Sequence, residues 1–261
     1  MNLLPIAAFT ARRIVSRRKT LVLALLAAAP PLFVIVVRRF APPRALDPFF
    51  ETIPLFYLVF LCQILPLFFA GSVVRDAVED RTASFVLTTP SSRTAFVFGA
   101  WLGVVPPIVV MIATSAACTF AAWRAGTGPI GGPEDLVLFG RLSATAAAGA
   151  LVYSALFTLL GLVVKWPTVV GILYYGIFEL FLGFIPGAPR RLALSSYLEA
   201  LLEPPFRTRA QLIAEGPAGI DVPITPGDAR LVLAGVLLAA SVALYFRSRT
   251  RDFTDETATA R

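Results

Sequence analysis

The chain has 261 residues, of which 57% are hydrophobic and only 15% are charged, whereas soluble domains carry about a quarter charged residues. Its net charge is +7, but the basic residues flank long apolar runs and are not interleaved with aromatic residues as in nucleic-acid binders, so we expect no nucleic-acid partner. Because histidine is absent, histidine metal sites and serine–histidine triads are excluded, and the composition indicates a multi-span membrane protein.

We predict an all-α integral membrane protein that forms one transmembrane domain over residues 1–261. Six apolar runs are long enough to cross a hydrocarbon core about 30 Å thick. They are Leu21–Val37, Ile53–Val74, Thr94–Ala122, Leu142–Val164, Thr168–Ile185 and Ala229–Phe246. The third run is long and contains Pro106 and Pro107, so we expect it to tilt, to kink at these prolines or to extend past the membrane.

Residues 1–19 precede the first run and carry a cluster of five basic residues at 12, 13, 17, 18 and 19. A basic front before an apolar centre also resembles a signal peptide, but the long lead and the apolar residues that follow Pro30 and Pro31 favour a retained span. The basic half of the segment is a candidate interfacial helix on the inner leaflet, or a plain topological anchor.

The distribution of basic residues predicts the orientation of the chain. Placing the N-terminus in the cytoplasm puts thirteen of the 23 lysines and arginines on the inside, including the cluster before the first run. Six spans then return the C-terminus to the cytoplasm. We therefore expect a multi-pass protein of the cytoplasmic (inner) membrane with both termini inside.

The connection between the second and third runs, Arg75–Arg93, is charged and rich in hydroxyl groups. Acidic residues at its front suit a helix N-terminus, and Thr89 followed by Pro90 predicts an N-cap and first-turn proline for the third span. The acidic residues are Asp76, Glu79 and Asp80, and the apolar residues that follow them are Phe85, Val86 and Leu87. We expect a short helix docked under the bundle and hinged at Pro90; an ordinary capped loop is the alternative.

The largest connection, Pro186–Gly227, lies outside in this topology. Apolar residues recur at roughly helical spacing through residues 192–202, and Ser195 or Ser196 is placed to cap a short helix that ends before the prolines at 204 and 205. Such a helix is too short to span a membrane. We therefore expect an amphipathic cap or a re-entrant piece between the fifth and sixth spans.

Glu179 lies within the fifth run, in the stretch YYGIFELFLGF. A carboxylate in lipid is costly and is a functional candidate by default, so Glu179, Tyr174 and Tyr175 could line a substrate path. The carboxylate could pair with a cation, touch a polar cargo or carry a proton. The alternative is a structural glutamate, neutral or hydrogen-bonded, packed against Tyr174, Tyr175 or another span.

The stretch EDRTASFVLTTPSSR, which begins at Glu79, resembles the cytoplasmic segment of the ABC-2-type exporter permeases. The residues that match the pattern of this family are Thr82, Leu87, Thr88, Thr89, Pro90 and Arg93. Arg81 stands where the family usually has glycine, and Ser84 where it often has glutamate. The basic lead, six spans, long outer loop and final YFRSRTRDF extend the resemblance along the chain.

The resemblance implies a permease subunit of an ATP-driven exporter, in which a second copy or a sister permease completes the pathway. ATP and Mg would bind a separate ATP-binding subunit, because this chain has no G-x-x-x-x-G-K-[ST] motif. We therefore expect no enzyme activity, cofactor, metal site or catalytic residue in the chain itself, and membrane lipid as a further partner. The implied coupling helix that contacts the ATPase comprises Arg75, Asp76, Glu79, Asp80, Arg81, Thr82, Phe85, Leu87, Pro90 and Arg93.

Two other functions are compatible with the sequence. An ion-coupled secondary transporter would use Glu179, although few other intramembrane charges and no repeated pair of broken helices support it. A non-transporting membrane scaffold would use the polar connection to bind a different protein. The sequence does not specify a cargo.

Overall fold

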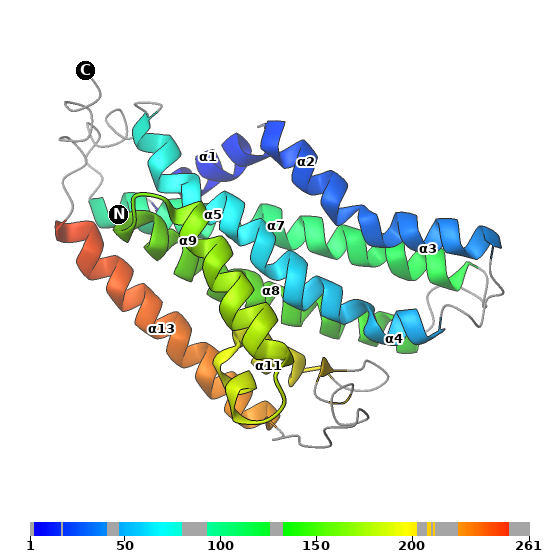
Figure 1. Cartoon of the computed structure of the whole chain (residues 1–261). Helices are drawn as coiled ribbons and strands as arrows, with labels where there is room; N and C mark the ends of the chain where they lie inside the picture. The colour runs from blue at the N-terminus through cyan, green and yellow to red at the C-terminus, as the bar shows by residue number, and fades with distance from the viewer. Residues whose placement is uncertain are drawn as a thin grey trace.

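The computed structural model describes residues 3–16, 18–40, 47–79, 93–125, 133–202, 208–209, 211 and 224–250, and these form an all-helical bundle (Figure 1). The helices before the first long connection are α1 (Leu3–Val15), α2 (Arg18–Ala27), α3 (Ala29–Phe40), α4 (Asp47–Leu55), the π-helix η2 (Phe56–Leu61) and α5 (Cys62–Glu79). They are followed by α7 (Arg93–Arg124), α8 (Pro133–Val163), α9 (Pro167–Tyr174), the π-helix η3 (Tyr175–Phe181), α10 (Leu182–Phe184), the 3-10 helix η4 (Ala188–Leu192), α11 (Leu194–Glu199) and α13 (Pro226–Thr250).

Within the described residues, five helical stretches are long and apolar enough to cross a membrane, and a sixth is present if the bent pair α2 and α3 counts as one span. The five are Glu51–Val74, Arg93–Arg124, Leu136–Val163, Pro167–Phe184 and Pro226–Thr250. The predicted all-α class is therefore confirmed, and each of the six predicted runs corresponds to a candidate span. The third run extends beyond its predicted bounds as one helix of 32 residues that continues through Pro106 and Pro107.

The first candidate span is broken, whereas the sequence predicted a single run. Helices α2 and α3 meet at Ala28 with a bend of 40°. Pro31 has no backbone N–H to donate to the carbonyl of Ala27, so the helical hydrogen bond is lost at that point. The hydroxyl of Ser115 in α7 donates to the Ala27 carbonyl instead. The bend is therefore supported by a neighbouring helix, as expected for a proline break at membrane depth.

The N-terminal helix α1 packs closely on the first part of α7. A Cβ atom at Gly103 would lie 2.5 Å from the carbonyl oxygen of Ala7, and one at Gly99 would lie 2.8 Å from Ile6. Glycine at these two positions therefore lets the two backbones approach each other. The predicted helix in the pre-membrane segment is confirmed as a helix, and Leu4 on its other side is 83% exposed.

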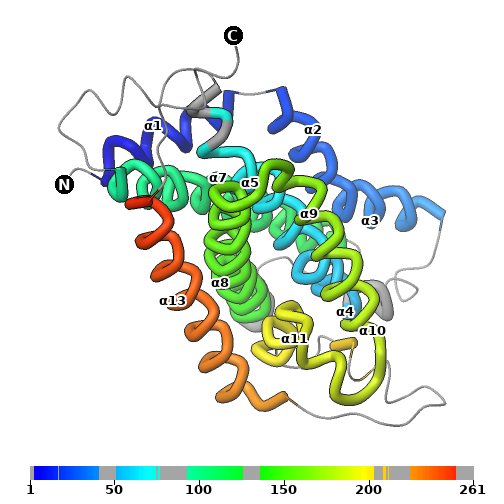
Figure 2. The backbone as a smooth tube through the Cα atoms, turned by 60° about the vertical axis from the view of Figure 1, so that its left-hand side comes forward, coloured from blue at the N-terminus to red at the C-terminus, as the bar shows by residue number. Residues whose placement is uncertain are grey.

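Helix α1, the start of α7 and the end of α13 lie at one end of the bundle, and α11 lies at the other end (Figures 1 and 2). At the first of these ends, Ser248 near the end of α13 donates to the hydroxyl of Thr94 at the start of α7 over 3.3 Å. The guanidinium of Arg13 in α1 donates to the carbonyl oxygen of Asp76 in α5 over 2.8 Å. The orientation with both termini in the cytoplasm remains a prediction.

Helix α5 lies at the centre of the bundle, and the fifth and sixth candidate spans lie at its edge. In the most apolar window of the second span 72% of the residues are buried, against 28% in the fifth span and 22% in the sixth. Helix α5 crosses α8 at close range, since a Cβ atom at Gly161 would lie 2.5 Å from the carbonyl oxygen of Gly71. The edge spans therefore leave apolar surface to contact lipid or another chain.

Replacing Gly103 by alanine is expected to lower the stability of the bundle, although alanine is the better helix former. The added methyl group would force α1 away from α7, and overpacking of this kind costs about 1–3 kcal/mol. Thermal unfolding of the purified protein in detergent micelles measures the effect. The matched control is Gly235→Ala in α13, where nothing lies within 4 Å of the added atom. Equal melting temperatures for the two variants would contradict the close packing of α1 on α7.

Candidate functional site

The carboxylate of Glu179 is the centre of a buried polar cluster at the end of the bundle where α11 lies. Glu179 lies in the π-helix η3 and has no exposed surface. The hydroxyl of Tyr153 in α8 donates to its Oε1 atom over 2.8 Å, and the hydroxyl of Tyr174 in α9 donates to the same atom over 3.0 Å. Two helices of the bundle therefore supply donors to a carboxylate on a third element.

The first turn of α11 supplies the other donors to Glu179. The backbone N–H of Leu194 donates to Oε1 over 3.1 Å, and that of Ser195 donates to Oε2 over 3.1 Å. The hydroxyl of Ser195 also donates to Oε2, over 2.6 Å. The first N–H groups of a helix have no partner within the helix, and they favour a negative charge. Glu179 therefore caps α11 from a different part of the chain.

The prediction that Ser195 or Ser196 caps this helix is wrong. Helix α11 begins at Leu194, and its N-cap residue is Ala193, whose methyl group cannot accept a hydrogen bond. Ser195 thus lies within the first turn, where its hydroxyl bonds to Glu179 rather than to its own helix. The apolar side chain of Leu198 in the same helix is fully buried and would lie 2.8 Å from a Cβ atom at Gly149 in α8. The short helix is therefore packed into the bundle, and its role as an amphipathic cap or a re-entrant piece remains a prediction.

A buried ion pair completes the cluster. The Nε atom of Arg209 lies 2.5 Å from Oε1 of Glu199, and the backbone N–H of Arg209 donates to Oε2 of Glu199 over 2.8 Å. The two other guanidinium nitrogens of Arg209 donate to the backbone carbonyl of Glu179, over 2.8 Å, and to the hydroxyl of Ser195. Both charged side chains are fully buried. Arg209 therefore connects the segment after α11 to both α11 and η3.

The space for Arg209 depends on glycine at position 183. A Cβ atom there would lie 2.3 Å from the Nη1 atom of Arg209, and the guanidinium lies 5.2 Å from the ring centre of Phe184. Burial raises the pKa of the Glu199 carboxyl above its ordinary value, and the positive charge of Arg209 opposes this rise. The charge of Glu199 is thus stabilised in the fold by Arg209.

The hydrogen bonds limit what Glu179 can do chemically. Five donors engage its two oxygens, and an ionised carboxylate acts only as an acceptor. The structure brings Glu179 and Tyr174 together, whereas the ring of Tyr175 lies edge-on to that of Phe60 at 6.3 Å. This geometry agrees with the structural interpretation of Glu179. A substrate path along Glu179, Tyr174 and Tyr175 remains a prediction.

Sequence reasoning missed three members of this cluster, Tyr153, Glu199 and Arg209, and assigned Ser195 a different role. The sequence did indicate that Glu179 has hydrogen-bond donors from elsewhere in the chain, because a carboxylate in an apolar run requires them. The sequence did not indicate which donors these would be. Arg209 follows Glu179 by 30 residues, and no periodicity connects the two.

The predicted coupling helix lies mostly outside the described residues. Helix α5 continues beyond its candidate span to Glu79, so the backbones of Arg75, Asp76 and Glu79 are helical, and Arg93 is the exposed first residue of α7. Asp76 and Glu79 thus lie in the last turn of α5, and the prediction that they begin a new helix is wrong, because the second span continues through them as one helix. The predicted contact residues beyond the described part of the chain are Asp80, Arg81, Thr82, Phe85, Leu87 and Pro90.

Asp76 contacts the basic N-terminal segment. The Nζ atom of Lys19 lies 2.8 Å from Oδ2 of Asp76 and donates to the hydroxyl of Ser72 over 2.7 Å. Together with the bond from Arg13 to the Asp76 carbonyl, these contacts attach the segment before the first span to the end of α5. A contact between Asp76 and an ATPase subunit remains a prediction.

Comparisons with known proteins do not identify a family. No family profile matches the chain, and no curated protein is significantly similar to it. Within the described ranges, no group of three or more cysteine, aspartate or glutamate side chains is placed to hold a metal ion.

We expect Arg209→Gln to destabilise the fold by about 3–5 kcal/mol, because Glu199 would then remain buried without its partner charge. The double variant Glu199→Gln with Arg209→Gln should recover part of this loss, since neither charge remains. Unfolding of the purified variants in detergent measures both values. Arg191→Gln is the control, because this arginine is exposed and its change should leave stability nearly unaltered. A similar small loss in Arg209→Gln and Arg191→Gln would contradict the buried ion pair.

Glu179→Gln is expected to loosen α11, since the new NH₂ group would face donors rather than accept from them. The accessibility of Cys62 measures this loosening, because Cys62 is buried and both Cys62 and Leu198 of α11 lie next to Gly149 in α8. In a Cys118→Ser background, maleimide labelling of Cys62 should be faster in Glu179→Gln than in the parent. The control is Asp228→Asn, which alters an exposed carboxyl group at the start of α13. Unchanged labelling in Glu179→Gln would show that the carboxylate does not hold α11.

Proposed function

We propose that this chain is the membrane-spanning permease subunit of an ATP-driven exporter of the ABC-2 type. The observation that carries the proposal is the position of the segment that bears the resemblance. Residues 80–92 connect α5, which extends beyond its candidate span to Glu79, with α7, which begins at Arg93. The segment thus joins the ends of two long helices of the central bundle, where a partner could act on both.

The packing around this connection supports a mechanical role. Helix α1 packs on α7 at Gly99 and Gly103, and Lys19 and Arg13 attach the same N-terminal segment to Asp76 in α5. A force on the connection would therefore reach α1, α5 and α7 together. In the proposed mechanism, an ATP-binding subunit contacts residues 75–93 and its closure tilts these helices, with ATP and Mg on the partner.

The proposal includes a location and an assembly. The chain would lie in the cytoplasmic membrane with both termini inside, and a second copy or a sister permease would complete the pathway. The ion-coupled alternative receives little support from Glu179, because exchange of a proton or ion there would disturb five hydrogen bonds.

Purification of the tagged chain from its native cell in mild detergent, followed by mass spectrometry of the proteins that accompany it, tests the proposal. A stoichiometric ATPase with a Walker motif is the expected result. A stable and monodisperse chain without an ATPase, or one accompanied by a different stoichiometric partner, would contradict it.

In the reconstituted complex, Phe85→Asp is expected to uncouple ATP hydrolysis from transport, since a charge would replace the apolar contact in the predicted coupling helix. Transport per ATP hydrolysed should fall by about tenfold or more, as expected when a charge breaks an apolar contact, while the variant still inserts into the membrane. Phe40→Asp is the matched control, because Phe40 is an 86% exposed aromatic residue at the end of α3, far along the chain from the connection. Normal coupling in Phe85→Asp would count against this contact surface.

A further inference from the structure

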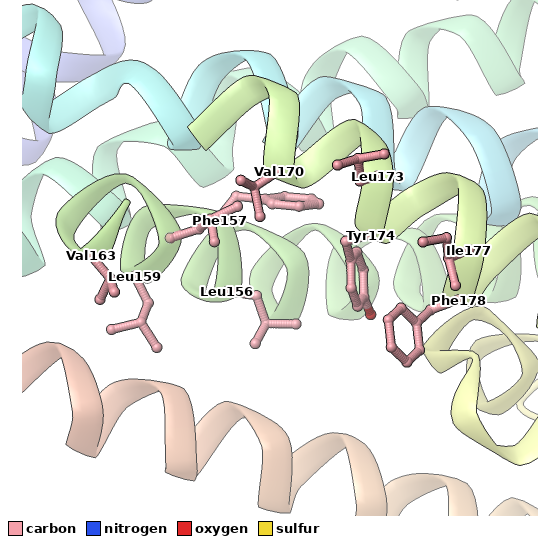
Figure 3. Close-up of a pocket in the computed structure, with 10 residues that line it drawn as sticks. Leu156, Phe157, Leu159, Val163, Val170, Leu173, Tyr174, Ile177 and Phe178 are labelled. Carbon is pink, nitrogen blue, oxygen red and sulfur yellow. The ribbon is translucent and has the colours of Figure 1, made fainter. Parts of the chain in front are cut away.

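An apolar groove of about 530 Å³ runs between α8 and the α9–η3 helix (Figure 3). Its walls include Leu156, Leu159 and Val163 from α8, and Val170, Leu173 and Ile177 from α9 and η3. The volume falls within the range of about 300–1,000 Å³ that is typical of small-molecule sites. Unlike most such sites, this one presents almost no polar atoms from its walls, so it suits a hydrocarbon chain.

The groove opens to the surroundings of the bundle rather than to its core. Val163, Leu173 and Ile177 are each about half exposed or more, at 55%, 56% and 50%. Tyr174 also lines the groove, but its hydroxyl donates to Glu179 and so adds no free polar group to the wall. In a membrane, a groove of this kind on an edge span is filled by lipid unless another protein covers it.

The inner end of the groove has a different chemistry. Val163 is the last residue of α8, and after Val164 come the exposed residues Lys165 and Trp166, before α9 begins at Pro167. Trp166 is the N-cap residue of α9 and supplies no side-chain cap to the first N–H groups of the helix. A lysine and a helix N-terminus both favour an anion, and tryptophan is enriched at the membrane interface.

We propose that this groove binds one acyl chain of an anionic phospholipid, whose phosphate group lies at Lys165 and the N-terminus of α9. The apolar walls accept the hydrocarbon chain, and the positive end accepts the headgroup. In the proposed orientation this end faces the cytoplasm, where anionic lipids attract basic residues close to the surface. The inference requires the chain to lie in a membrane but does not depend on an ATPase partner.

The bound lipid would also contact the buried polar cluster indirectly. Its acyl chain would lie against the ring of Tyr174, which stacks on Phe178 at 5.4 Å and bonds to Glu179. The lipid would therefore help to hold the ring of Tyr174 in the position from which its hydroxyl donates to Glu179.

Native mass spectrometry of the full-length chain in detergent micelles tests the proposal, with phosphatidylglycerol and phosphatidylcholine of the same acyl chains added in parallel. We expect one phosphatidylglycerol to bind to each chain about fivefold more tightly than phosphatidylcholine, a preference equivalent to one nearby lysine. Lys165→Gln should remove this preference and leave phosphatidylcholine binding unchanged. Arg247→Gln, which removes an exposed cation at the end of α13, should leave the preference intact.

A second variant tests the groove itself. Val170→Phe should weaken binding of both lipids by at least fivefold, because the larger side chain fills the groove. Leu238→Phe on the exposed face of α13 is the control and should bind both lipids as the parent does. Melting temperatures of the variants separate misfolding from loss of binding.

Three results would overturn the proposal. These are equal affinity of the parent for the two lipids, equal loss in Val170→Phe and Leu238→Phe, and a dimer of this chain that excludes both lipids and dissociates in Val170→Phe. The third result would assign the groove to a second copy of the chain. None of these results bears on whether an ATPase accompanies the chain.

Discussion

A carboxylate within an apolar helix must find hydrogen-bond donors, and the end of the bundle that contains α11 is arranged around that requirement. Glu179 draws α8, α9 and α11 together, because each contributes a donor to its two oxygens. Arg209 then bonds to the Glu179 carbonyl and forms an ion pair with Glu199 at the end of α11. A buried charge without partners is costly. The removal of Glu179, Glu199 or Arg209 is therefore expected to destabilise the hydrogen bonds and the ion pair that the remaining residues form.

Hydroxyl groups and glycines organise the rest of the helical contacts. Tyr57 lies in the π-helix η2, and its hydroxyl lies 3.0 Å from that of Ser115 and 2.9 Å from that of Thr119. Ser115 also bonds to the Ala27 carbonyl freed at the proline break, so this small network connects the broken first span to α7 and η2. Glycines on α7 and α8 bring the backbones of α1 and α5 close to these two helices.

The helical class and the candidate spans could be predicted from the sequence, because membrane spans are signalled by local composition and length. The bend at Ala28 could have been inferred from the adjacent prolines, but its support by Ser115 could not, since Ser115 is 88 residues away from Ala27. Glu179 was identified as a buried carboxylate, whereas its donors were not, because their pairing depends on tertiary packing. The error at Ser195 has the same origin: a capping pattern is local, and here a residue of another helix supplies the acceptor.

The order of residues around Glu179 bears on how the chain enters a membrane. Tyr153 and Tyr174 are synthesised before Glu179, so these two donors are present when the fifth span emerges. Ser195 follows 16 residues later and Arg209 follows 30 residues later. The fifth span must therefore be inserted with its acidic group only partly satisfied, which membrane insertion scales penalise. The return of the chain as α11 completes the set of donors, so the fifth span reaches its final position only after the residues up to α11 and Arg209 have been synthesised.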